Sequence, residues 1–119
     1  METQTQSDVL HSENLEWLKR LASYADEVNA MQLQIEGIAA SYTSQSVMAK
    51  IEHFQNQLII QKHRINSLKH SIKNNEKLIN LDTNVADTDH ASAKDQVNTF
   101  EKIISDLRQE LGQFMQQAI

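Results

Sequence analysis

Histidine and carboxylate side chains are the groups in this chain that could carry out chemistry, because the sequence has five histidines, sixteen acidic residues and no cysteine. Histidines and carboxylates together can hold a zinc ion, and a histidine can also form a pH-sensitive contact. His63 and His70 are separated by seven positions, which on a helix is two turns and about 10 Å. One metal ion cannot bind both, because helical ligand pairs need a spacing of about three or four residues.

His11 and His90 are the second candidate pair, because the topology inferred below brings them to the same end of the molecule. The carboxylates expected near them are Asp8, Asp82, Asp87 and Asp89. Such a group could bind zinc, could form a pH-sensitive contact, or could consist of ordinary polar residues that close the end of the fold. The sequence leaves these alternatives open, and we predict no metal site and no cofactor.

Motifs of other chemistries are missing. Asp82-Thr83-Asn84 begins like a calcium-binding loop, but Asp87 stands at the sixth position, where glycine is needed, and Ala93 at the twelfth, where glutamate is needed. The sequence contains no glycine-rich phosphate loop, no nucleophile elbow and no His-Glu-x-x-His motif. We therefore predict that the chain is not an enzyme.

Positive charge is concentrated in the middle of the chain. Residues 44–81 carry six lysines or arginines against two acidic residues, whereas the stretches on either side are acidic. The outer face of a helix through this stretch supplies the candidate partner-binding residues, which are Ile59, Ile60, Lys62, His63, Lys69, His70, Lys73 and Lys77. The cations could bind an acidic protein surface or a phosphate-rich ligand, or they could be balanced by the acidic stretches within the fold. Nucleic acid is a less favoured partner, because the net charge is -5 and no aromatic residue alternates with these lysines.

Heptad repeats define the elements that must position these side chains. In the middle of the chain, isoleucine or leucine recurs every seventh residue from Ile51 to Ile79, which predicts a long helix. Gln61 and Asn75 interrupt the companion positions of this repeat. They could be buried amides that fix the register or half-exposed side chains at the edge of the seam, and we favour the second interpretation. Similar repeats run from Leu10 to Tyr42 and from His90 to Ala118.

Two breaks separate the three repeats. Between Ala40 and Ser46 the apolar positions shift by two residues, and the serines there predict a turn with Ser44 or Ser46 as the cap of the next helix. The exact position of this turn is left open. Asn80 to Asp89 collects poor helix formers, which predicts a second loop with Asp87 or Thr88 as the cap of the third helix.

These observations predict an all-α fold, an antiparallel up-down-up three-helix bundle. Its helices are long and coiled-coil-like, with a left-handed supercoil, and span about 8–42, 46–81 and 88–118. Residues 1–7 are expected to form a flexible N-terminal tail, and residues 8–119 a single domain. The absence of proline and the presence of only two glycines favour an all-helical chain.

The function expected of such a chain is protein–protein interaction, as a scaffold or chaperone-like module that contacts a protein partner or a second copy of itself. The alternative is an anion-binding or nucleic-acid-binding module that uses the basic face of the middle helix. No apolar stretch approaches the length of a membrane span, and no basic region with a following apolar run begins the sequence. We therefore expect a cytoplasmic protein with no membrane partner.

Overall fold

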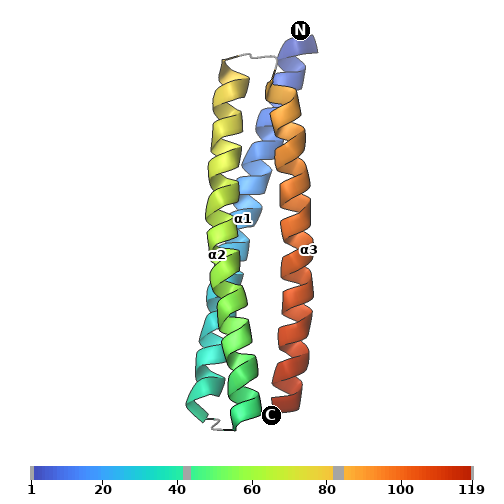
Figure 1. Ribbon diagram of the computed structural model, residues 1–119. Helices are drawn as coiled ribbons and strands as arrows, with labels where there is room; N and C mark the ends of the chain where they lie inside the picture. The colour runs from blue at the N-terminus through green and yellow to red at the C-terminus, as the bar shows by residue number, and fades with distance from the viewer. Residues whose placement is uncertain (1, 42–43, 82–84, 119) are drawn as a thin grey trace.

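The computed structural model describes residues 2–41, 44–81 and 85–118, with the side chains described from Ser7 to Gln117 within these ranges. Three helices account for almost all of this part: α1 (Glu2–Ser41), α2 (Gln45–Asn80) and α3 (Ala86–Ala118). Consecutive helices are antiparallel: in Figure 1 α1 runs down, α2 up and α3 down, so that the start of α1, the end of α2 and the start of α3 lie at one end of the molecule. The predicted three-helix bundle is confirmed.

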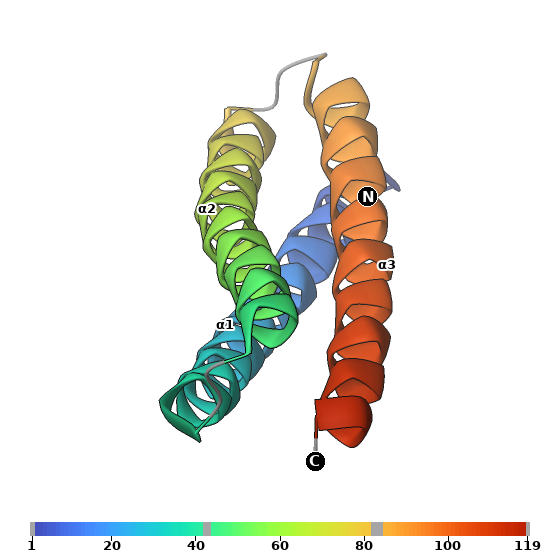
Figure 2. The ribbon, with the colours of Figure 1, turned by 60° about the horizontal axis from the view of Figure 1, so that its bottom comes forward.

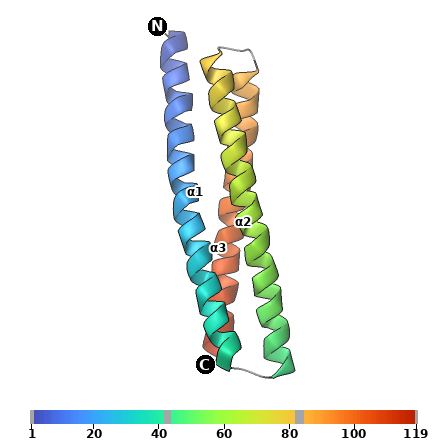
Figure 3. The same cartoon turned by 90° about the vertical axis from the view of Figure 1, so that its left-hand side faces the viewer.

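The bundle is long and narrow, measuring 63 × 18 × 17 Å. The central helix in the packing is α2, which contacts both of its neighbours extensively, whereas α1 and α3 contact each other much less. The three axes do not lie in one plane, because α1 passes behind the other two helices (Figure 2). A side view shows α1 and α2 running past each other over most of their length (Figure 3). This arrangement leaves one face of α2 uncovered.

The helix ends differ from prediction at two places. Helix α1 already begins at Glu2, so the residues predicted as a flexible tail continue the helix, because glutamate and glutamine in this stretch are good helix formers. Helix α3 begins at Ala86, so Asp87 and Thr88 are not its cap. Asp87 and Asp89 lie instead in its first turn, where carboxylates complement the positive end of the helix dipole. The predicted end of the first helix at Tyr42, and Asp82 in the second loop, lie outside the described residues.

The first turn between helices confirms one of the two predicted caps. The hydroxyl of Ser44 accepts a hydrogen bond from the backbone N–H of Val47 at 3.4 Å, which satisfies an unpaired amide at the start of α2. At the other end of α2, the N–H of Leu81 donates to the carbonyl of Lys77 at 3.0 Å.

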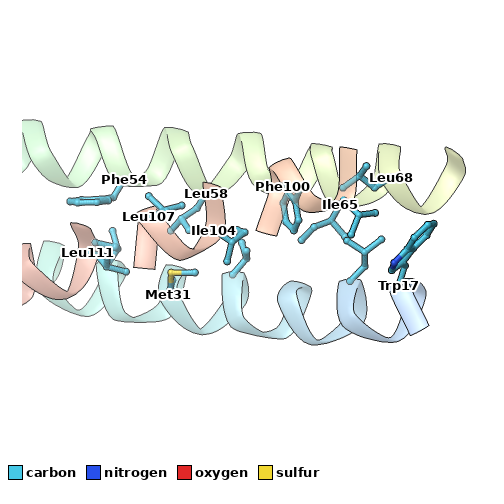
Figure 4. Packing of buried hydrophobic residues seen from close by; sticks show 14 of the residues in the cluster. Trp17, Met31, Phe54, Leu58, Ile65, Leu68, Phe100, Ile104, Leu107 and Leu111 are labelled. Atoms are coloured by element: carbon cyan, nitrogen blue, oxygen red, sulfur yellow. The ribbon is translucent and has the colours of Figure 1, made fainter. Parts of the chain in front are cut away.

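The core consists of the heptad positions of all three helices. In α2, every residue of the repeat from Ile51 to Ile79 is buried, and Figure 4 shows side chains from the three helices meeting in one interior. Aromatic rings contribute at the end near the C-terminus, where the centroids of Phe54 and Phe114 lie 5.3 Å apart. The seams predicted from the sequence therefore form the core.

Four polar side chains share this core: Asn14, Gln61, Asn75 and His90. The interpretation of Gln61 and Asn75 as half-exposed is wrong, because both are fully buried. The physical reason is that α2 is covered by α1 on one side and by α3 on the other, so neither companion position reaches solvent. Three of the four polar residues lie at the same end of the bundle, where they form hydrogen bonds with one another.

Candidate functional site

The outer face of α2 carries the residues predicted to bind a partner. Ile59, Ile60, His63, His70, Lys73 and Lys77 are exposed, and Lys62 and Lys69 are partly covered. Lys62 and Lys69 line a small hollow of about 180 Å³ with Ala25 and Asn29, so these two lysines lie toward α1. The structure therefore places all eight residues on the solvent side of one helix, as the sequence predicts.

The apolar pair on this face is conspicuous because its neighbours on the helix surface are polar or charged. Ile59 is 48% exposed and Ile60 is 41% exposed. His63 follows them by four and three positions, so the three side chains are neighbours on the helix surface. The pair forms a small apolar patch within a basic surface, which suits a partner that buries apolar groups and offers carboxylates around them.

Among the described residues, the lysines and the arginine of α2 take no part in ion pairs. In the part of the chain that the structure describes, Lys50, Lys62, Arg64, Lys69, Lys73 and Lys77 form no ion pair with a carboxylate. The arginines of α1 and α3 do form ion pairs, and two of these join α1 to α3, Arg20 with Glu101 and Arg108 with Glu27. The acidic helices thus do not balance the basic one by direct pairing.

A groove between α2 and α3 lies beside this face. It has a volume of about 430 Å³, and its lining includes the side chains of Leu68, Phe100 and Ile103. Arg64 of α2 and Asp95 of α3 line it as well. The sequence did not predict this groove, because its residues come from two helices whose relative rotation is set by packing.

Polar contacts also connect α1 to α3. The hydroxyl of Tyr24 donates to Glu101 Oε2 at 2.7 Å. Burial, followed by this hydrogen bond, raises the pKa of Tyr24 to about 12. Arg108 Nη2 donates to Glu27 Oε2 at 2.9 Å, and this hydrogen bond raises the pKa of Arg108 above its usual value. Directed polar pairs therefore connect α3 to α1, whose backbones approach each other at few points.

A second site lies at the end of the bundle where the end of α2 and the start of α3 lie beside the N-terminal half of α1. We call it the end cluster, and it consists of His11, Glu13, Asn14, Trp17, Asn75, Glu76, Asp89 and His90. As the sequence predicts, His11 and His90 both belong to it. They do not touch a common atom, because His11 pairs with Glu76 at 2.6 Å and His90 lies in the core.

Asn75 is the centre of the end cluster. Its Nδ2 donates to the backbone carbonyl of Ala86 at 3.1 Å and to Asp89 Oδ2 at 2.9 Å. Its Oδ1 accepts from Asn14 Nδ2 at 3.0 Å, and it lies 2.9 Å from His90 Nδ1. One buried amide thus connects α1, α2 and α3 and also fixes the start of α3 after the second loop.

The end cluster does not have the make-up of a metal site. Among the described side chains, no group of three or more histidines and carboxylates converges as metal ligands would. Asp8 and Asp87 are exposed, and Asp82 lies outside the described residues. The remaining alternatives are a pH-sensitive contact and a simple polar closure of the bundle.

Sequence reasoning missed Asn14, Glu13 and Glu76 as members of the end cluster. A usable signal existed, because Asn14, Asn75 and His90 all occupy heptad core positions at the same level of an antiparallel bundle. Polar side chains at core positions that face each other are expected to form hydrogen bonds with one another.

Comparison with known proteins gives no assignment for this arrangement: no family model, no curated protein and no solved structure matches the chain. The described helices also include none with an apolar stretch long enough to cross a bilayer.

Proposed function

We propose that the chain is a non-enzymatic interaction module, a scaffold or chaperone-like protein that binds an acidic protein surface with the outer face of α2. The observation that carries this proposal is the absence of ion pairs at the α2 cations in the described part of the chain. The rest of the bundle is acidic, yet none of the ion pairs among the described residues joins one of its carboxylates to a lysine or arginine of α2. The basic face is therefore available to an external partner.

The apolar pair is the part of this surface that would supply most of the binding affinity. Charged groups at an interface mainly speed association and select partners, whereas buried apolar side chains supply most of the affinity. Ile59 and Ile60 lie in the half of the face nearer the start of α2, and Lys62 and His63 follow at once. An acidic helix with apolar residues on one side would cover both features.

The test is a pull-down with the full chain, read by quantitative mass spectrometry. The face variant is Ile59→Gln with Ile60→Gln, because glutamine removes the apolar contact and remains a good helix former. We expect partners of the wild-type chain to be depleted severalfold by this variant. The matched control is Leu33→Gln, since Leu33 of α1 is 69% exposed and lies outside the face.

A charge variant tests the basic half of the same surface. Lys62→Glu with Lys69→Glu should deplete the same partners, whereas Lys94→Glu with Lys102→Glu on α3 makes an equal change of charge elsewhere and should retain them. Lys94 and Lys102 are exposed and, like the α2 lysines, form no ion pair among the described residues. Retention of every partner by both face variants would contradict the proposal.

The unpaired cations also favour a second candidate function, binding of a phosphate-rich ligand. Polyphosphate is a suitable probe, because phosphate binding by lysines weakens steeply with added salt. This candidate predicts polyphosphate binding at low salt that weakens with added salt and with Lys69→Glu. No binding at low salt would eliminate it and leave the protein partner.

A further inference from the structure

His90 is the only histidine with a described side chain that is buried, at 4% exposure. Its ring stacks on Trp17 of α1 with centroids 4.7 Å apart and an interplanar angle of 25°. The ring nitrogens point to two different helices, with Nδ1 toward Asn75 of α2 and Nε2 toward Glu13 of α1. Gain or loss of a proton on this ring therefore changes contacts that involve all three helices.

The orientation of the Asn75 amide decides which nitrogen of His90 carries a proton. The two groups next to Asn75 Nδ2 are a backbone carbonyl and a carboxylate, and both can only accept hydrogen bonds. The opposite orientation would place the amide oxygen against these two acceptors and is excluded. Asn75 Oδ1 must therefore face His90 Nδ1, and a carbonyl oxygen requires Nδ1 to be the donor.

The contact made by the second nitrogen, Nε2, then depends on the protonation state of the ring. Nε2 lies 3.4 Å from Glu13 Oε1 but has no hydrogen-bond partner in the described part of the chain. In a neutral ring with its proton on Nδ1, Nε2 presents a lone pair to a carboxylate, and two acceptors facing each other gain nothing. In the imidazolium form, Nε2 becomes a donor and pairs with Glu13.

The surroundings of the ring come from all three helices. Glu13 and His11 lie on α1, Glu76 on α2 and Asp89 on α3. The three carboxylates favour the charged ring, whereas burial disfavours it. Glu76 is already paired with His11 at 2.6 Å, and Asp89 accepts from Asn75. Glu13 is therefore the carboxylate left to respond to His90.

The other polar links between α1 and α3 do not change in mild acid. They pair arginine or tyrosine with glutamate, through Arg20, Tyr24 and Arg108, and these donors keep their protons throughout the range in which histidine titrates. We propose that the end cluster is a proton-dependent contact. Protonation of His90 forms the ion pair with Glu13 and so joins the N-terminal part of α1 to α3. At higher pH this ion pair is absent, and the N-terminal part of α1 is held mainly by its contacts with α2.

Trp17 provides the readout, because it is the only tryptophan of the chain and it stacks on His90. The fluorescence of Trp17 should change on acidification, because the ring stacked on it gains a charge when it is protonated. In Glu13→Gln the midpoint of this change should move to lower pH, because the charge that pairs with the imidazolium is gone. His90→Gln should abolish the change, which shows that it arises from this ring.

Two control variants separate this contact from its neighbours. Glu16→Gln removes a carboxylate of α1 that pairs with Arg20 and should leave the midpoint unchanged, whereas His11→Gln should retain the fluorescence change. An equal midpoint in wild type and Glu13→Gln, or loss of the change in His11→Gln, would overturn the proposal.

A nitrogen-15 NMR spectrum of the histidine rings gives an independent check that needs no variant. At high pH His90 should be the tautomer with its proton on Nδ1, and at low pH both nitrogens should be protonated. A proton on Nε2 at high pH would contradict the hydrogen-bond pattern on which the proposal rests.

Discussion

At the scale of single residues, the two amides in the core positions of α2 behave differently. Asn75 has all its hydrogen-bonding side-chain atoms paired with groups of the two neighbouring helices, α1 and α3, whereas the Oε1 of the buried Gln61 has no partner within the described structure. A buried polar group costs little when it is paired and about 1–3 kcal/mol when it is not. Asn75 therefore specifies the arrangement of the helices, while Gln61 lowers the stability of the core.

Replacing Asn75 should be strongly destabilising. In Asn75→Leu, Asn14 Nδ2, His90 Nδ1 and the carbonyl of Ala86 lose a buried partner, and we expect the free energy of unfolding to fall by about 3 kcal/mol. Urea denaturation followed by circular dichroism measures this change.

Two other leucine substitutions in the same helix are controls for this experiment. Asn74→Leu changes the exposed neighbour and should alter the free energy of unfolding by less than about 0.5 kcal/mol. Gln61→Leu removes the unpaired oxygen and should stabilise the bundle. Equal losses in Asn75→Leu and Gln61→Leu would show that any apolar replacement of a core amide disturbs packing, and that the network at Asn75 has no special role.

Tyr24 makes stability depend on pH in the alkaline range. Its folded-state pKa of about 12 lies above the 10.0 of a free tyrosine, so the folded state holds the phenolic proton more tightly than the unfolded state does. The stability that this group contributes is complete below about pH 10 and is lost as the pH rises toward 12. Tyr24→Phe should therefore lose less stability than wild type between about pH 10 and pH 12, measured by urea denaturation. Identical pH profiles for the two proteins would contradict the assignment.

At the scale of the helices, the sequence predicted the elements well because a heptad repeat is a local signal. The phase shift after Ala40 and the cap at Ser44 placed the first turn correctly. The start of α1 was not predictable in this way, because Glu2 to Ser7 carries no apolar period although its residues tolerate a helix. The burial of Asn75 could not be predicted from its own helix either, since it depends on how α1 and α3 cover α2.

The two glycines are positions where a substitution should increase the stability of the protein. Gly37 lies in α1 and Gly112 in α3, and a methyl group added at either would meet no atom within 4 Å. Alanine restricts the unfolded chain more than glycine does and forms helix more readily. We expect Gly37→Ala and Gly112→Ala each to raise the free energy of unfolding by about 0.4–1 kcal/mol.

Thermal or urea denaturation of the two glycine variants and of the double variant measures these gains. The two glycines lie on different helices and an added methyl group at either would meet no atom within 4 Å, so the gains should add. A loss of stability at either site would contradict this expectation.

At the scale of the whole molecule, the bundle is much more extended than a globular domain. Its radius of gyration is 18.3 Å, whereas a compact domain of this length would have about 13.5 Å. An extended shape exposes a long surface for its mass. The sequence predicted this shape from three long repeats of similar length, but it could not predict that the α2 cations stay unpaired, because pairing depends on the rotation of each helix about its axis.

The separation of charge across the bundle predicts how the protein responds to salt. One face is basic, the rest is acidic, and the acidic helices of a second copy are the nearest available partner for the α2 cations in a purified sample. We expect light scattering to give an apparent mass that rises above 13.6 kDa with concentration at low salt and returns to the monomer value at high salt, because salt screens exposed charges. Lys62→Glu with Lys69→Glu should remain monomeric in both conditions, whereas Lys94→Glu with Lys102→Glu should associate at least as strongly as wild type. A wild-type chain that is monomeric at high concentration in low salt would exclude self-association and leave an external acidic protein as the partner of the α2 face.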